Sequence, residues 1–191
     1  ETLDLRGGPA TEVDGVERFG AGTTTGNAWA GPVPAQWFYT RRRQFIPTGA
    51  YGFYVGSQRP SYTDTRGLFE LRYAPKLSEK LSMAARLHGD LYTYDGLFDY
   101  GGGAIYLERY SSTSGGAELR FLYTPTTALK LTLGGEYIQA PDTTMQGWDP
   151  LPKGGKSYYI DGSYPYNISA AYALVDADPT TWLKLSAGAR L

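Results

Sequence analysis

The sequence predicts an all-β protein, built as an antiparallel transmembrane β-barrel of the outer-membrane type. First, apolar and polar residues alternate along several segments with a period of two, as in strands with one apolar and one polar face. Second, short turns alternate with long connections, the asymmetry of an outer-membrane barrel. Third, 25 glycines, 12 prolines and 15% aromatic residues, led by 17 tyrosines, favour strands and turns over helices.

Length and charge narrow the possible classes. The 191 residues suffice for one domain or for part of a larger one. A net charge of −1 provides no field that would attract nucleic acid. The absence of cysteine excludes a disulfide framework and a Cys-ligated metal site. Residues 1–8, ETLDLRGG, lack the basic and apolar regions of a signal peptide, which indicates a mature chain or a fragment.

Hydropathy leaves a membrane location open. No run approaches the roughly 18 apolar residues of a membrane helix. The mean hydropathy of −0.37 is nevertheless compatible with a barrel, because each strand of a barrel needs an apolar residue only at every second position. The expected location is the bacterial outer membrane, with membrane lipid and lipopolysaccharide as partners.

The first third of the chain offers a strand at 1–8 and one or two strands at 35–45. A strand at 66–74 leads into a short turn, whereas a strand at 1–8 leads into a long loop, so the two run in opposite directions. An even number of strands must therefore lie between them. Only one crossing is clear. We therefore expect either a hidden strand in 9–34 or missing residues, and seven or eight strands in total.

Three hairpins follow, each with a proline near its turn, at Pro75, Pro125 and Pro179. In the first, residues 69–73 lead through a turn into 81–92. In the second and third, the strands after the turn are 128–138 and 182–191. The residues expected on the apolar face are Phe69, Leu71, Tyr73, Leu81, Met83, Ala85, Leu87, Leu91, Ala117, Leu119, Phe121, Tyr123, Leu129, Leu131, Leu133, Tyr137, Leu183, Leu185, Ala187 and Ala189.

The expected strands are about 9–12 residues long, which a tilted strand needs to cross the hydrocarbon core. Long loops are predicted at 45–64, 95–106 and 140–157. Tyr73 and Tyr123 precede short turns, as expected of the aromatic girdle at a membrane boundary, and Tyr137 is placed at the opposite rim. Glycine and alanine are tolerated on the outward face because lipid, rather than a packed core, covers it.

Several stretches resemble the barrel of the TonB-dependent receptors, ligand-gated transporters of Gram-negative outer membranes. They are TRGLFELRYAPKLSEKLSMAARLHGDLYTYDGLFDYGGG, GGAELRFLYTPTTALKLTLGGEY and TTWLKLSAGARL, and RRRQFIPTGAYG is similar to one of the family's strand-to-loop passages. The close resemblance spans roughly 66–96, 117–140 and 170–191. The plug domain and the TonB box of the family are not found in the sequence.

The resemblance implies that residues 1–191 are part of one barrel domain, about a third of a barrel of about 22 strands. It implies uptake of a scarce nutrient, such as a metal chelate, a cobalamin-like cofactor or a glycan. In such a receptor the outer loops and a plug capture the ligand, and the energy-coupling protein TonB pulls on the plug to open a path. No resident cofactor is implied.

Aromatic residues of the predicted loops are the candidates for ligand contact. They can stack on a sugar or a chelate, and packing of the loops among themselves is an equal alternative. These residues are Tyr94, Phe98, Tyr100, Trp148, Tyr158 and Tyr159.

Charged residues of mixed sign are expected to face the interior, where they pack against another protein element or fill a closed polar interior. Mixed signs favour such packing over an ion-selective pore. The interior-facing residues are Glu70, Arg72, Arg86, His88, Asp90, Glu118, Arg120, Glu136, Lys184 and Arg190.

Two alternative functions are open. A self-contained barrel of about eight strands, filled by side chains, would act as a structural anchor or adhesin. A barrel enzyme would use His88 with Asp90, but no nucleophile motif such as G-x-S-x-G is present, so catalytic and metal-binding residues are not expected. Arg41–Arg43 is either a lipopolysaccharide contact or a solvated strand end.

Overall fold

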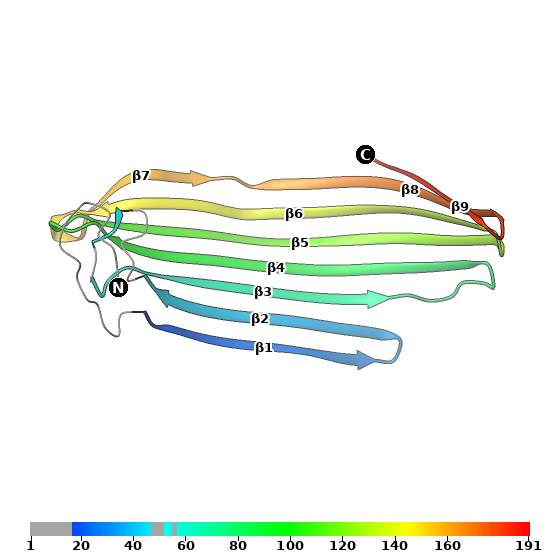
Figure 1. Cartoon of the computed structure of the whole chain (residues 1–191), viewed down its shortest axis with the longest axis horizontal. Coiled ribbons are helices and arrows are strands. Elements are labelled where there is room, and N and C mark those ends of the chain that lie inside the picture. The colour runs from blue at the N-terminus through cyan, green and yellow to red at the C-terminus, as the bar shows by residue number, and fades with distance from the viewer. Residues whose placement is uncertain (1–16, 47–51, 55–56) are drawn as a thin grey trace.

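In the computed structural model, which describes residues 17–46, 52–54 and 57–191, the chain forms one antiparallel sheet of long strands lying side by side (Figure 1). A 3₁₀ turn, η2, covers Pro152–Gly154. The strands are β1 (Phe19–Ala30), β2 (Val33–Phe45), β3 (Ser61–Tyr73), β4 (Leu81–Asp99), β5 (Ile105–Thr126), β6 (Leu129–Pro150), β7 (Lys156–Ser163), β8 (Tyr166–Thr180) and β9 (Leu183–Arg190). No helix in the described ranges is long and apolar enough to cross a bilayer.

The strands are ordered β1-β2-β3-β4-β5-β6-β8-β9, and β7 also pairs with β6. β8 pairs with the first half of β6 and β7 with its second half, so β7 and β8 follow each other along the same neighbour. The all-β, antiparallel prediction is confirmed. The predicted closure into a barrel is not seen. β1 and β9 lie at opposite edges of the sheet, which is open.

The hidden strand exists. β1 lies within residues 9–34, and with β2 it gives the even number of crossings before β3 that the alternation of turns required. Residues 1–8, the predicted first strand, lie outside the described residues. The described residues form nine strands, more than the predicted seven or eight. β7, a short strand beside β6, was not predicted.

The predicted loops at 95–106 and 140–157 are wrong over most of their length. β4 continues to Asp99 and β6 to Pro150, so only residues 100–104 and 151–155 connect these strands to the next ones. Three successive glycines with positive φ, Gly101 to Gly103, reverse the chain within the first connection. The sequence predicted loops because these stretches are rich in glycine, tyrosine and aspartate, but the backbone hydrogen bonds of a sheet do not depend on the side chains, so the strands continue through them.

The short turns are confirmed at one end of the sheet, where β1–β2, β3–β4, β5–β6 and β8–β9 are joined (Figure 1). The connections at the other end include 46–60, the longest. β4, β5 and β6 have 19, 22 and 22 residues, more than the predicted length.

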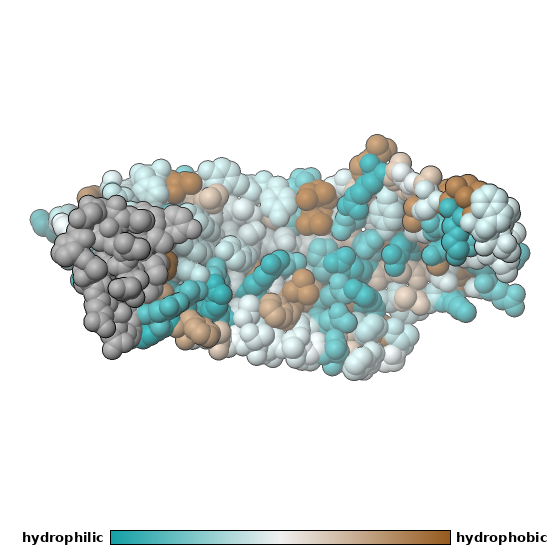
Figure 2. All heavy atoms as spheres, viewed as in Figure 1, coloured by the Kyte–Doolittle hydropathy of each residue, from teal (hydrophilic) through white to brown (hydrophobic). Residues whose placement is uncertain are grey.

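The register confirms the two predicted faces. Leu71, Leu87, Ala117 and Tyr137 lie opposite one another on successive strands and belong to what we call the apolar face. Arg72, Arg86, Glu118 and Glu136 lie opposite one another one position along, on the polar face. Hydrophilic side chains gather over the middle of the face shown in Figure 2 and towards the end with the short turns.

The sheet has almost no apolar core. Among the described residues, only Phe53, Ala140 and Trp148 are buried hydrophobic residues. On the apolar face, Leu87, Leu133 and Leu185 are 56%, 59% and 54% exposed. A soluble monomer rarely exposes so continuous an apolar surface.

The apolar face changes character along the strands. On β4 it is apolar from Leu81 to Leu91 and then presents Thr93 and Asp95. Arg109 lies opposite Asp95 on β5. The sheet thus has two levels, an apolar level near the short turns and, beyond it, what we call the polar extension. In the extension this face carries Asp95 and Arg109, followed by Leu97, Leu107 and Trp148.

Candidate functional site

The polar extension carries a cavity of about 540 Å³, here called the aromatic pocket. It lies at the end of the sheet opposite the short turns. Strands β2 to β5 and the β2–β3 and β4–β5 connections supply its lining. Its lining residues are Arg42, Ile46, Phe53, Tyr62, Asp64, Tyr94, Phe98, Tyr100 and Glu108.

Strand register brings the pocket residues together. Arg42, Asp64, Tyr94 and Tyr110 lie opposite one another on β2, β3, β4 and β5, and therefore share the polar face. The rings of Tyr62 and Tyr94 stack with centroids 6.0 Å apart, and those of Tyr94 and Tyr110 with centroids 5.3 Å apart. The tyrosines form an ordered row across three strands.

A glycine makes room for the aromatic side chains. A Cβ at Gly96 would lie 2.8 Å from the ring of Phe98 and 3.0 Å from that of Tyr94. Both rings therefore lie over the glycine, between the strands that flank β4. The position needs glycine for close approach, not for an unusual backbone conformation.

The β2–β3 connection covers one side of the pocket. Phe53 is 5% exposed; its ring stacks on Phe98 at 5.1 Å and meets the edge of Tyr100 at 5.2 Å. Asp99 fixes this arrangement, because it accepts hydrogen bonds from Ser57 Oγ (2.8 Å) and from the Gly101 amide (2.9 Å). These two hydrogen bonds hold the pKa of the Asp99 carboxyl below its usual value.

Polar groups occupy the other side. Arg42 Nη2 donates to Tyr62 Oη (2.8 Å), which donates to Gln44 Oε1 (2.8 Å), and Arg42 lies 3.9 Å from Asp64. Glu108 accepts a hydrogen bond from Tyr159 Oη at 3.2 Å.

Three tyrosines in or beside the pocket stay protonated well above neutral pH. Burial, followed by the charge of Glu108, raises the pKa of Tyr94 and of Tyr159. Burial, followed by a hydrogen bond to Glu108, raises the pKa of Tyr110 to about 12. These phenols therefore remain neutral groups that can donate a hydrogen bond.

Three of the six predicted ligand residues, Tyr94, Phe98 and Tyr100, line the pocket. Tyr159 lies next to it, beside Glu108, with its ring 6.0 Å from that of Tyr106. Trp148 and Tyr158 do not join it: they pair on the opposite face, where Lys156 Nζ lies 4.1 Å from the Trp148 ring. The alternation of side chains along β6 and β7 separates the last two from the rest.

Six residues of the pocket lining were not predicted from the sequence: Arg42, Ile46, Phe53, Tyr62, Asp64 and Glu108. Arg42 belongs to the run Arg41–Arg43, which strand alternation divides: Arg42 points to the pocket face and its two neighbours to the other. Arg42 and Asp64 could have been predicted if the register between β2, β3 and β4 were known. The alternation of residues along one strand does not give that register.

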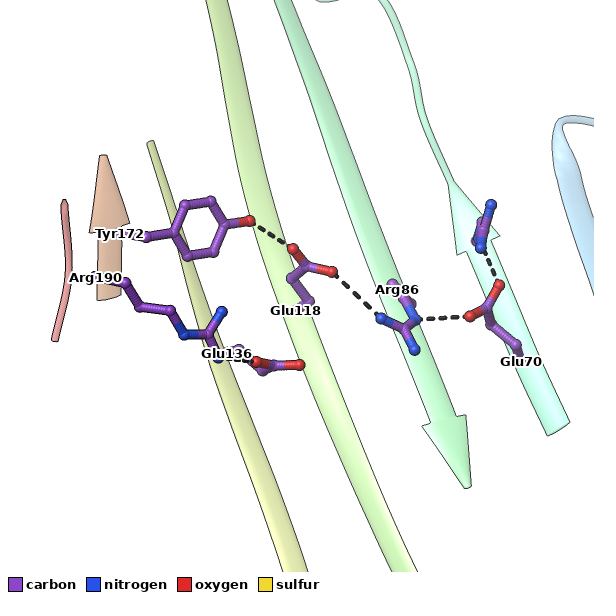
Figure 3. A network of polar contacts seen from close by, with 7 residues as sticks. Glu70, Arg86, Glu118, Glu136, Tyr172 and Arg190 are labelled. Carbon is purple, nitrogen blue, oxygen red and sulfur yellow. Dashed lines mark hydrogen bonds and ion pairs between the residues drawn. The ribbon is translucent and has the colours of Figure 1, made fainter. Parts of the chain in front are cut away.

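A second polar assembly, here called the charge ladder, crosses the apolar level on the polar face (Figure 3). Glu70 pairs with Arg72 and with Arg86 Nε (2.6 Å), and Arg86 lies 3.6 Å from Glu118. Glu118 accepts a hydrogen bond from Tyr172 Oη at 2.5 Å, and Glu136 pairs with Arg190 at 2.5 Å. These contacts link β3, β4, β5 and β8, and also link β6 with β9. The Arg190 guanidinium lies 5.8 Å from the centroid of the Tyr172 ring and so joins the two groups.

Six of the ten residues predicted to face the interior form this ladder, and Tyr172 was missed. Lys184 instead pairs with Asp178 near the β8–β9 turn, at 3.7 Å. His88 packs over Gly116, and its two ring nitrogens have no hydrogen-bond partner among the described residues. No hydrogen bond or ion pair joins His88 to Asp90 within that part of the chain.

Comparisons with known proteins identify no relative: no family model, no curated protein and no solved structure matches the chain. Within the ranges that the structure describes, no group of three or more acidic or histidine side chains is placed to hold a metal ion.

Proposed function

We propose that the chain is a section of the wall of an outer-membrane transport barrel, which takes up a scarce nutrient. Its apolar face contacts lipid, its polar face borders the interior, and the aromatic pocket binds the nutrient on the outer side. The observation that carries the proposal is the contrast between the faces of one sheet: Leu87, Leu133 and Leu185 are more than half exposed, whereas Glu70 on the other face is 5% exposed within a charge ladder.

Strand length supports a membrane location. The apolar stretch of β4 from Leu81 to Leu91 is about 11 residues long, which suffices for a tilted strand to cross the hydrocarbon. Tyr73 and Tyr123 lie on the apolar face near the short turns, and both are exposed, as expected for residues at a bilayer boundary.

The open edges support a section rather than a small complete barrel. The outer edge of β1 and that of β9 have no neighbouring strand among the described residues, and a bilayer does not tolerate unpaired backbone groups. Further strands of a larger wall would satisfy both edges. A self-contained barrel acting as an anchor would need β1 to pair with β9.

The resemblance to TonB-dependent receptors implies how uptake would work. In this mechanism an interior plug releases the nutrient when the TonB protein pulls on it. The mixed charges of the ladder suit contact with such an element, because carboxylates and guanidinium groups on one surface can meet both donors and acceptors. The enzyme alternative has no comparable support, since His88 and Asp90 do not interact in the described region.

The test uses adjacent residues of β9 with opposite orientations. The chain contains no cysteine, so Leu185→Cys and Ser186→Cys in the full-length protein each provide a unique labelling site. After reconstitution into vesicles, a fluorophore at position 185 is expected to be quenched by lipids with brominated acyl chains. A fluorophore at position 186, on the polar face, is expected to be unaffected.

Equal quenching at the two positions, or none at position 185, would contradict the proposal. A correct-folding control is the resistance of both variants to unfolding in detergent, compared with the unsubstituted protein. Ser186→Cys replaces an exposed hydroxyl that donates to Asp176 Oδ1 (2.7 Å) by a weaker donor of similar size, and Leu185 is 54% exposed, so neither change should unfold the sheet.

A further inference from the structure

The lining of the aromatic pocket has an apolar side and a polar side. Phe53, Phe98 and Tyr100 contribute aromatic carbon to one side, and Arg42, Asp64 and Glu108 contribute charged groups to the other. The volume, about 540 Å³, lies in the range of small-molecule sites. A ligand that fills it must combine apolar surface with several hydrogen-bonding groups.

The charges of the lining disfavour an anionic ligand. Arg42 is the cationic member of the lining, and its guanidinium already interacts with Asp64 (3.9 Å) and with Tyr62 (2.8 Å). Asp64 and Glu108 are two carboxylates against that single cation. A phosphorylated ligand or an anionic ferric chelate would meet net repulsion, since like charges brought together in a partly buried site are destabilising.

The polar groups suit a polyol. The Asp64 and Glu108 carboxylates are acceptors that can receive hydrogen bonds from neighbouring hydroxyls, and Arg42 is a donor. Tyr94 lines the cavity, and its hydroxyl has no hydrogen-bond partner within the described ranges. Its raised pKa keeps the phenol neutral, so that it can both donate and accept.

We propose that the aromatic pocket binds a neutral carbohydrate. The apolar side contacts the C–H groups of the sugar rings, and Asp64, Glu108, Arg42 and Tyr94 bond to their hydroxyls. This narrows the nutrient of the proposed transport function, on which the physiological role of the site depends. Carbohydrate binding itself can be measured without transport.

The experiment measures binding by calorimetry with the full-length protein, in a detergent that has no sugar headgroup. The probes are neutral oligosaccharides of glucose, xylose, mannose and galactose, compared with a ferric catecholate and with cyanocobalamin. At least one neutral oligosaccharide is expected to bind. Asp64→Asn is expected to weaken it about tenfold or more, and Tyr94→Phe about fivefold, from the loss of one charged and one neutral hydrogen bond.

Tyr137→Phe is the matched control for Tyr94→Phe, because it removes one hydroxyl from the apolar face and should leave the affinity unchanged. Tyr94→Phe keeps the ring and its stacking, so it tests the site even if Asp64→Asn fails to fold. The proposal is overturned if no neutral oligosaccharide binds, if Tyr94→Phe binds like the unsubstituted protein, or if the ferric catecholate or cyanocobalamin is the ligand that binds.

These outcomes separate the two proposals. Failure to bind carbohydrate, with lipid quenching at position 185 alone, leaves the barrel wall intact and rejects the ligand. Carbohydrate binding without lipid quenching retains the ligand and rejects the membrane location.

Discussion

On the polar face, Gly116 allows a side chain to pack directly on the backbone. The ring of His88 lies over Gly116, where a Cβ would be 2.5 Å from His88 Nε2 and 2.8 Å from the carbonyl oxygen of Tyr137. The imidazole can rotate away, but the carbonyl belongs to the β5–β6 ladder and cannot move without disturbing it. The neighbouring Gly115 has no such contact, since the nearest atom to its Cβ would be 3.6 Å away.

Gly116→Ala should therefore lower the free energy of unfolding by about 1–3 kcal/mol, the usual effect of forcing an atom into occupied space. Gly115→Ala is the matched control and should have no destabilising effect, because alanine costs less backbone entropy than glycine in a strand. Urea denaturation of the two variants in the same lipid vesicles measures the difference. Equal losses would show that the close contact at Gly116 is not limiting.

Tyr110 should titrate late. Its pKa is raised from 10.0 to about 12, first by burial and then by Glu108. The folded protein keeps this phenol protonated where the unfolded chain ionises, so its contribution to stability is complete below about pH 10. That contribution is lost as the pH rises from 10 towards 12. The difference in tyrosinate absorbance between the protein and its Tyr110→Phe variant isolates the group.

Glu108→Gln should lower the pKa of Tyr110, because it removes the negative charge that opposes ionisation. An ordinary titration of Tyr110 near pH 10 in the unsubstituted protein would contradict the described surroundings of the ring.

At the scale of strands, the charge ladder should contribute more than the ion pairs of the polar extension. The side chains of Arg86 and Glu70 are 34% and 7% exposed, whereas those of Arg109 and Asp95 are 60% and 52% exposed. Both pairs are close, at 2.6 and 2.7 Å. Arg86→Met should lower the free energy of unfolding by about 2–3 kcal/mol, because it leaves Glu70 nearly buried with fewer partners.

Arg109→Met should cost less than about 1 kcal/mol, as for exposed ion pairs. The same substitution is made at both positions, so the difference between the two losses of stability reports how much the burial of the ion pair matters. Similar losses for the two variants in equilibrium unfolding would mean that water reaches Glu70 as easily as Asp95.

Sequence alone predicted the strands whose two faces differ and failed where they do not. Leu119 beside Glu118, and Leu131 beside Lys130, reveal β5 and β6 through their contrast. β1, FGAGTTTGNAWA, has mostly small and polar residues on both faces and was not located from its pattern. The end of β4 from residue 95 and the second half of β6 from residue 140 were predicted as loops, because they are rich in residues that favour turns. The hydrogen bonds of these strands are made by backbone groups. Since these groups are nearly the same in every residue, the sequence pattern does not reveal them.

The candidate site was predictable only in part. Tyr94, Phe98 and Tyr100 were found because aromatic residues cluster in the sequence. Arg42 and Asp64 contact the same cavity from other strands, and their meeting depends on the register of β2, β3 and β4. Register is set by turn geometry and by packing along whole strands, so a local pattern does not determine it.

For the whole molecule, the two faces and the two levels define distinct environments. At the apolar level, one face exposes leucines and the other holds the charge ladder. In the polar extension, the continuation of the apolar face carries Asp95 and Arg109, and the polar face carries the aromatic pocket. A bilayer around the apolar level would leave the pocket in water, where the proposed ligand could reach it.

The boundary between the levels can be located with Leu91→Cys and Asp95→Cys, which lie on the same strand and the same face. In vesicles, a fluorophore at position 91 should be quenched by brominated acyl chains, because this residue ends the apolar stretch. Asp95→Cys should instead react rapidly with a water-soluble maleimide and escape quenching, because it lies about 13 Å farther along the strand, at roughly 3.3 Å per residue. Quenching at both positions would place the pocket at membrane depth and exclude direct access from water. Quenching at neither would mean that protein rather than lipid covers the apolar face.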